Sequence, residues 1–109
     1  LGAFEVSAVG DLANWWTGDP QDVPVIGGAM DLACGAKAIW AMMEHTTKDG
    51  RPKIVESCAY PLTAARVITR IFTDLATIDI TPAGLHVREK VEWISSEELQ
   101  ARTAAPLTF

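Results

Sequence analysis

The stretch Val25-Ile26-Gly27-Gly28-Ala29-Met30-Asp31-Leu32 decides how this chain is interpreted. Two adjacent glycines stand between an apolar approach and a run of good helix formers, residues 29–36. A Gly-Gly pair lets the backbone turn sharply, and a helix that begins just after it has unpartnered N–H groups. Such amides can bind a phosphate, a carboxylate or the oxygen of an activated carbonyl. Taken alone, the pair fits a simple strand-to-helix turn better than a ligand site, because a short glycine motif is weakly specific.

The segments around the glycines predict an α/β domain. Residues 29–36 fit one face of a two-turn helix, and Asp31 suits the positive end of its dipole, which is a structural role. Residues 37–44 are apolar without alternation, so we expect a strand buried on both faces, as in a parallel sheet covered by helices. His45 begins a polar turn after this strand. It has no partner that marks a catalytic pair, so we expect a hydrogen-bonding loop histidine.

The rest of the chain adds strands and one more helix. Residues 1–6 predict a short strand, and Gly10-Asp11 predicts a turn. Residues 75–80 and 85–91 alternate around Thr81-Pro82-Ala83-Gly84, which predicts a hairpin with one solvated face. That face carries His86. Ser95 followed by Glu98 matches a capping box and predicts a last helix, to about Ala104. Residues 53–58 are ambiguous, and residues 64–71 fit a helix or a strand.

Composition places the chain among single-domain globular proteins. Its 109 residues are 49% hydrophobic and 21% charged, with a formal net charge of −5. This acidic balance argues against nonspecific nucleic-acid binding, because no basic stripe exists to neutralise phosphates. The sequence has no apolar run long enough to span a membrane and no signal peptide, so we expect a cytoplasmic protein. It begins without Met inside an apolar run, so we expect a fragment or a processed chain.

The sequence lacks the motifs that mark several common classes of enzyme site. Cys34 and Cys58 could pair, but without a secretory signal we expect buried free thiols. The cysteines and histidines have no metal-ligand spacing, so we expect no metal. The sequence contains no nucleophile elbow, no phosphate loop and no dinucleotide fingerprint. The residues alone therefore predict an acidic α/β domain with a backbone-amide anion site and leave the reaction open.

Several blocks together resemble the β subunit of class I CoA-transferases of the 3-oxoacid and 3-oxoadipate kind. The order and spacing agree through nearly all 109 residues, which is far more specific than one glycine motif. The matching blocks are Gly10-Asp11-Leu12-Ala13-Asn14-Trp15, Gly27-Gly28-Ala29-Met30-Asp31-Leu32, Met43-Glu44-His45-Thr46-Thr47-Lys48-Asp49-Gly50, Cys58-Ala59-Tyr60-Pro61-Leu62-Thr63, Arg70-Ile71-Phe72-Thr73-Asp74-Leu75, Asp79 with Gly84-Leu85, and Thr103-Ala104-Ala105-Pro106.

The resemblance implies a CoA-transferase-like α/β fold, in which a mixed sheet is flanked by helices and followed by a C-terminal hairpin and short helix. It implies reversible CoA transfer from succinyl-CoA to a 3-oxo acid (3-oxoadipate or acetoacetate) through a glutamyl-CoA thioester. The family's nucleophilic glutamate lies in a Ser-Glu-Asn-Gly type motif that this chain lacks. Residues 1–109 therefore resemble the C-terminal half of a subunit that is roughly twice as long. Glu5, Glu44 and Glu56 do not match the nucleophile, and we expect the chain alone to be inactive.

Matched residue by residue, the resemblance assigns the oxyanion site to Gly28, whose N–H would face the thioester carbonyl oxygen. Gly27 would allow the close approach, and Asn14 lies on a loop that could form a wall of the pocket. The implied partners are a CoA-transferase α subunit, acyl-CoA and a 3-oxo acid. Coenzyme A enters as substrate, and no cofactor, nucleic acid or membrane is expected. The alternative is a non-catalytic acyl-CoA-binding or assembly module on the same scaffold.

Overall fold

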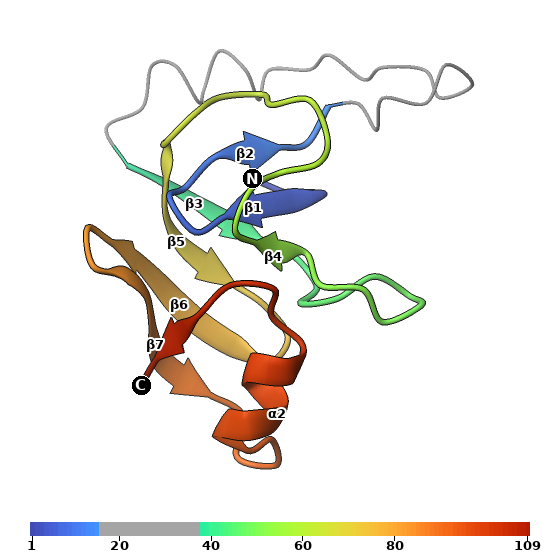
Figure 1. Ribbon diagram of the computed structural model, residues 1–109, viewed down its shortest axis with the longest axis vertical. Coiled ribbons are helices and arrows are strands. Elements are labelled where there is room, and N and C mark those ends of the chain that lie inside the picture. The colour runs from blue at the N-terminus through green and yellow to red at the C-terminus, as the bar shows by residue number, and fades with distance from the viewer. Residues whose placement is uncertain (16–37) are drawn as a thin grey trace.

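The computed structural model describes residues 1–15 and 38–109, and these residues form two β-sheets and a short helix (Figure 1). The elements in chain order are β1 (Glu5–Ser7), β2 (Leu12–Ala13), β3 (Ile39–Met42), β4 (Ile54–Val55), β5 (Ile68–Phe72), β6 (Ala76–Thr81), β7 (Gly84–Lys90), α2 (Ser96–Ala101) and β8 (Leu107–Thr108).

The smaller sheet has the strand order β2-β1-β4. β1 runs antiparallel to β2 and parallel to β4. Gly10, in the turn between β1 and β2, has a φ of +88°, which glycine adopts without strain. A Cβ atom there would lie 2.4 Å from the carbonyl oxygen of Ile68. The turn expected at Gly10-Asp11 is confirmed, and it needs a glycine because another strand packs directly against it.

The larger sheet has the order β3-β5-β6-β7-β8 and is mixed. β3 and β5 are parallel, β5, β6 and β7 are successively antiparallel, and β8 returns parallel to β7. The register shifts between Ile39 and Trp40 and again between Thr77 and Ile78, so each irregularity places one extra residue on the partner strand. The predicted hairpin is confirmed as β6 and β7, joined by a two-residue turn between Thr81 and Gly84.

The core lies on the inner face of the larger sheet and extends to the smaller sheet and α2. It is built from aliphatic side chains of every layer, such as Val6, Leu12, Ile54, Ile71, Ile78, Leu85, Ile94 and Leu99. Ser95 caps α2, because its hydroxyl accepts a hydrogen bond from the Glu98 N–H at 3.1 Å. The cap predicted from the sequence is therefore confirmed. The helix that follows it places Leu99 in the core.

The fold class expected from the sequence is confirmed as mixed α/β, with two corrections. The strands divide into two sheets rather than one. The strand expected over residues 37–44 exists as β3, but the described residues bury only one of its faces. Ile39 and Ala41 are buried, whereas the side chains of Trp40 and Met42 are 51% and 68% exposed. The helix expected over residues 29–36 lies outside the described residues.

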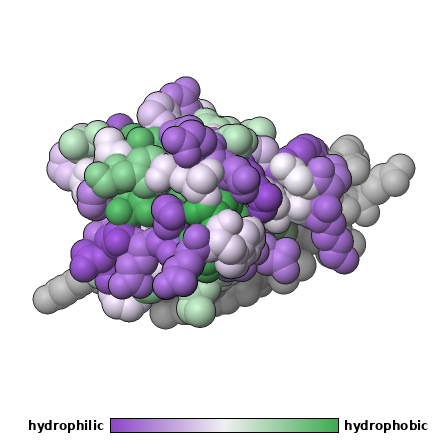
Figure 2. All heavy atoms as spheres, turned by 90° about the horizontal axis from the view of Figure 1, so that it is seen from below, coloured by the Kyte–Doolittle hydropathy of each residue, from purple (hydrophilic) through white to green (hydrophobic). Residues whose placement is uncertain are grey.

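The ambiguous segments resolve into strands. Residues 53–58 contain β4, and residues 64–71 lead into β5. The strand expected at residues 1–6 begins later, at Glu5, and extends to Ser7. Viewed from the end where α2 lies, hydrophilic atoms surround a band of hydrophobic ones (Figure 2). Within the described residues, every helix is too short and too polar to cross a membrane, and a cytoplasmic location stays a prediction.

Candidate functional site

The predicted glycine turn, Gly27-Gly28, lies outside the described residues, as do Asp31 and Cys34. The described part that precedes it along the chain is the end of β2, where Asn14 follows Ala13. Asn14 is held from three directions. Its backbone N–H donates to Thr63 Oγ1 at 3.1 Å, its side-chain Nδ2 donates to the Gly2 carbonyl at 3.0 Å, and its Oδ1 accepts from the Thr63 hydroxyl.

These bonds fix where the chain leaves the small sheet toward the predicted turn. Both polar groups of the Asn14 side chain are engaged by protein partners, so Asn14 orients the backbone directly. Its assignment as a wall of the substrate pocket stays a prediction. Thr63 belongs to the Cys58–Thr63 block, and no local pattern indicates its pairing with Asn14, which is 49 positions away.

Glu5 is a buried carboxylate with a defined structural partner. Its side chain is 8% exposed, and its Oε1 accepts the backbone N–H groups of Ala59 and Tyr60 at 2.8 and 3.0 Å. A carboxylate that bonds two amides satisfies donors that would otherwise be buried without partners. Glu5 therefore anchors the loop after β4 to β1, and the assignment of the nucleophile to a glutamate outside this chain stays a prediction. Glu44 and Glu56 are not buried.

A groove lies beside this loop. Phe4 and Tyr60 form an edge-to-face pair with ring centroids 6.0 Å apart, and hollows of about 270 Å³ and 450 Å³ adjoin the pair. Phe4, Thr47 and Tyr60 line both hollows, so the two are neighbours, and we refer to them together as the groove. The Glu5 carboxylate fixes the backbone of Tyr60 and thereby one wall of this groove.

The charges along the groove are unevenly paired. Lys48 and Lys53 line the smaller hollow, and within the described residues neither ammonium group has an ion-pair partner. Arg51, in the larger hollow, lies 3.3 Å from Asp49 at an exposed position. Glu44 is the acidic side chain in the smaller hollow. Two such ammonium groups beside an aromatic pair can bind an anionic ligand that also has apolar parts.

His45 lies just after β3 and is fully buried. Its ring Nε2 lies 2.8 Å from the Thr103 hydroxyl, which itself donates to the Leu99 carbonyl, so Nε2 carries the proton. Nδ1 lies 2.9 Å from the Thr73 hydroxyl, whose proton can be donated to Nδ1 or to the Ala76 carbonyl at 3.3 Å. Burial lowers the pKa of His45 to about 4; Asp74 opposes this fall and Arg102 adds to it. The expected hydrogen-bonding loop histidine is confirmed, and its side chain is buried in the core.

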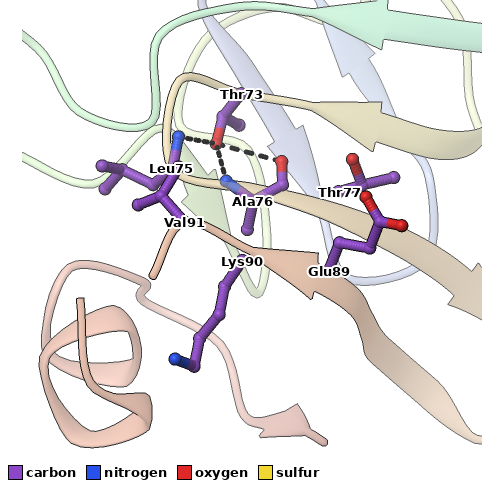
Figure 3. A pocket seen from close by; sticks show the side chains of 7 residues that line it. All are labelled: Thr73, Leu75, Ala76, Thr77, Glu89, Lys90 and Val91. Atoms are coloured by element: carbon purple, nitrogen blue, oxygen red, sulfur yellow. Dashed lines mark hydrogen bonds between the residues drawn. The ribbon is translucent and has the colours of Figure 1, made fainter. Parts of the chain in front are cut away.

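A smaller hollow, of about 180 Å³, lies at the base of the hairpin (Figure 3). Part of its polar lining is used by the protein, because the Thr73 hydroxyl accepts from the N–H groups of Leu75 and Ala76 at 3.1 Å each. The Lys90 side chain turns away from Thr73 and donates to the Ile94 carbonyl at 2.7 Å. Thr73 and Lys90 therefore serve the turn at the base of the hairpin.

The remaining reactive side chains show no catalytic arrangement within the part of the chain that the structure describes. Cys58 is a free, half-buried thiol, and burial together with the nearby carboxylates of Glu5 and Asp11 raises its pKa to about 12. A thiol with this pKa stays protonated and is a poor nucleophile. Residues 1–15 and 38–109 contain no cluster of three or more acidic, histidine or cysteine side chains that could hold a metal ion.

The family model for Coenzyme A transferase matches residues 1–100. The chain is 55% identical over 107 residues to the B subunit of 3-oxoadipate CoA-transferase from Acinetobacter baylyi, covering 98% of this chain and 49% of that protein. The corresponding protein of Pseudomonas putida is 51% identical over the same length, with 50% of that protein covered. The chain thus spans about half the length of these curated relatives.

Solved structures share the fold at low sequence identity. Glutaconate coenzyme A-transferase from Acidaminococcus fermentans superimposes with a TM-score of 0.73 at 16% identity, over 98% of this chain and 48% of that one. The decarboxylase AibA/AibB gives a TM-score of 0.70 at 18% identity, over 98% of this chain and 45% of that one. The fold therefore hosts more than one reaction, and the family rests on the sequence matches. By those matches, the chain belongs to the coenzyme A transferase family.

Proposed function

We propose that this chain is the C-terminal half of a CoA-transferase β subunit, which works with an α subunit to move CoA from succinyl-CoA to a 3-oxo acid, 3-oxoadipate or acetoacetate. The observation that carries the proposal is the 55% and 51% identity to 3-oxoadipate CoA-transferase B subunits over 98% of the chain. The relatives named for succinyl-CoA:3-ketoacid transfer are less similar, for example 38% in Helicobacter pylori. This difference favours 3-oxoadipate as the acceptor.

The roles proposed within this half are binding and stabilisation of charge. A glutamate elsewhere in the full-length enzyme attacks the thioester, and the Gly28 N–H, with Gly27 allowing close approach, stabilises the oxygen that becomes negative. Asn14 and Thr63 fix the end of β2, which is the described part of the chain that precedes the glycines in sequence. We assign the groove beside Phe4 and Tyr60 to the anionic part of acyl-CoA, since no carboxylate among the described residues pairs with its two lysines, Lys48 and Lys53.

The competing function is a non-catalytic acyl-CoA-binding or assembly module. The two differ in whether CoA moves between acids, so a transfer assay separates them. The full-length subunit with its α subunit is incubated with succinyl-CoA and either 3-oxoadipate or acetoacetate, and formation of the new acyl-CoA is followed by chromatography. Transfer to 3-oxoadipate supports the proposal. Binding of acyl-CoA without transfer to either acid supports the module.

The glycine assignment has its own test in that enzyme. Gly28→Val adds a side chain where the amide must approach the thioester, and we expect the transfer rate to fall about a hundredfold or more, as for the loss of one oxyanion donor. Gly35→Ala, seven positions later in the sequence, is the matched control and should have a much smaller effect on the rate. A folded Gly28→Val enzyme with unchanged turnover would remove the oxyanion assignment.

A further inference from the structure

The basic side chains of the groove are carried by one loop. Residues 44–53 connect β3 to β4 and place Lys48 and Lys53 in the smaller hollow, beside the aromatic pair. Thr47 of the same loop lines both hollows, and Arg51 lines the larger one. The position of this 44–53 loop therefore decides where the positive charges of the groove lie (Figure 1).

The 44–53 loop is folded by bonds among its own residues. The Thr47 N–H donates to the Arg51 carbonyl at 2.9 Å, and the Arg51 N–H donates to Thr47 Oγ1 at 3.0 Å. The Gly50 N–H donates to the Thr47 carbonyl at 3.0 Å, and the Lys53 N–H donates to the His45 carbonyl at 3.2 Å. These bonds set the shape of the loop, but they do not fix its place on the rest of the molecule.

Among the described residues, the hydrogen bonds that join the 44–53 loop to other elements are made at its two ends. Near its end, the Lys53 carbonyl accepts a backbone N–H of β1 at 3.0 Å. Near its start, the His45 N–H donates to Asp74 Oδ1 at 2.8 Å. The His45 ring lies 2.9 Å from the Thr73 hydroxyl and 2.8 Å from the Thr103 hydroxyl. His45 thus ties the start of the loop to the β5–β6 turn and to the segment after α2.

His45 is buried, and its bonds have a direction that apolar packing lacks. A buried imidazole needs a partner for each nitrogen, so the ring has one favourable position between the two hydroxyls. Glu5 acts in a similar way on the other wall of the groove, where it bonds the Tyr60 N–H. The two titratable side chains that are buried within the described residues therefore each hold one wall of the groove.

Resting on the proposed function, we propose that His45 is a positioning residue for acyl-CoA, whose buried bonds hold the 44–53 loop where Lys48 and Lys53 meet the anionic part of the ligand. The His45 side chain is not part of the groove lining, so it acts through the loop. The proposal makes the affinity for CoA depend on a side chain that does not touch it.

The first test measures binding of coenzyme A to the full-length αβ enzyme by isothermal titration calorimetry, which does not require transfer. His45→Leu removes both ring bonds, and we expect the Kd to rise about fivefold or more, as for the loss of one lysine contact. Thr103→Val removes one ring partner and should raise the Kd in the same direction, in a chain that keeps His45. Ile78→Val shortens a core side chain of β6 and should leave the Kd unchanged, which controls for a general loss of stability.

A double-mutant cycle separates positioning from a merely structural role. In an enzyme that carries Lys48→Ala and Lys53→Ala, His45→Leu should raise the Kd less than about twofold, because the groups that His45 positions are gone. An equal rise in both backgrounds would show that His45 affects binding by another route and would overturn the proposal. An unchanged Kd in folded His45→Leu and Thr103→Val enzymes would also overturn it.

Hydrogen exchange followed by mass spectrometry reports on the 44–53 loop itself. Without ligand, the amides of residues 46–53 should exchange about tenfold faster in His45→Leu than in the wild type, while those of β7 should change much less. A raised Kd with unchanged exchange in the loop would overturn the proposal, because the loop would then not depend on His45. Neither measurement requires transfer, so an enzyme that shows both expected changes but transfers no CoA would refute only the proposed transferase function.

Discussion

His45 is a buried titratable side chain that joins three parts of the chain. Its ring bonds Thr73 and Thr103, and its backbone N–H donates to Asp74 at 2.8 Å. A second proton places a positive charge in the core, while the ring can still bond Thr73 by donating to its hydroxyl oxygen. Burial, which disfavours the charged ring, is the main cause of the low pKa of about 4.

The low pKa predicts acid sensitivity. The unfolded chain binds a proton at His45 near its ordinary pKa of 6.5, whereas the folded protein does so only near 4. The contribution of His45 to the free energy of unfolding should therefore be fully present above pH 6.5 and fall by about 3 kcal/mol as the pH drops to 4. Urea denaturation at several pH values measures this loss. His45→Gln should remove that part of the pH dependence, and exposed His86→Gln should not. Parallel curves for the wild type and His45→Gln would contradict the prediction.

Variants of Glu5 can distinguish a structural role of this carboxylate from a catalytic one. Its Oε1 serves as acceptor for two amides, and a glutamine supplies the same oxygen without the charge. We expect Glu5→Gln to change the free energy of unfolding little, and Glu5→Ala to lower it by about 2 kcal/mol or more, because two N–H groups lose their partner. Thermal or urea unfolding measures both variants. A stable Glu5→Gln enzyme that has lost CoA transfer would instead make Glu5 a catalytic residue.

At the scale of elements, the cap of α2 stabilises the fold through a single hydrogen bond, so its contribution to the free energy of unfolding can be measured with one substitution. The Ser95 hydroxyl accepts from the Glu98 N–H, and Ser96 makes no side-chain hydrogen bond within the described residues. Ser95→Ala should therefore lower the free energy of unfolding by about 1 kcal/mol, while Ser96→Ala should leave it nearly unchanged. Urea denaturation of the two variants checks this. Equal effects of the two substitutions would show that the cap does not stabilise the fold.

Elements fixed by neighbouring residues can be predicted from the sequence. The hairpin follows from alternation on both sides of Thr81–Gly84, and the cap follows from Ser95 and Glu98, three residues apart. The strand β3 is predictable as a strand, but its exposed face depends on what lies across it in space. The anchor of Glu5 escapes prediction, because its amide partners lie 54 and 55 positions away. Sequence patterns report local geometry well and long-range partners poorly.

At the scale of the whole molecule, net charge and local charge differ in sign. The chain carries −5, yet three of its nine basic side chains lie within six residues: Lys48, Arg51 and Lys53. An anionic substrate is therefore repelled by the molecule as a whole and attracted only at a groove such as this one. Arg51 is near Asp49, which leaves the two lysines as the groups in the groove that can bind phosphate or carboxylate oxygens.

This arrangement predicts how the full-length αβ enzyme responds when the lysines are removed. Lys48→Ala and Lys53→Ala should each raise the KM for succinyl-CoA about fivefold, equivalent to about 1 kcal/mol, and leave kcat nearly unchanged, because the contact is the same in the ground and transition states. Lys90→Ala is the control, since its Nζ donates to the Ile94 carbonyl, away from the groove. Added salt should raise the wild-type KM more than that of the double variant, because screening weakens an attraction the variant lacks. If KM and its salt dependence stay unchanged in folded variants, the CoA anion binds elsewhere, and the groove is only the space between two loops.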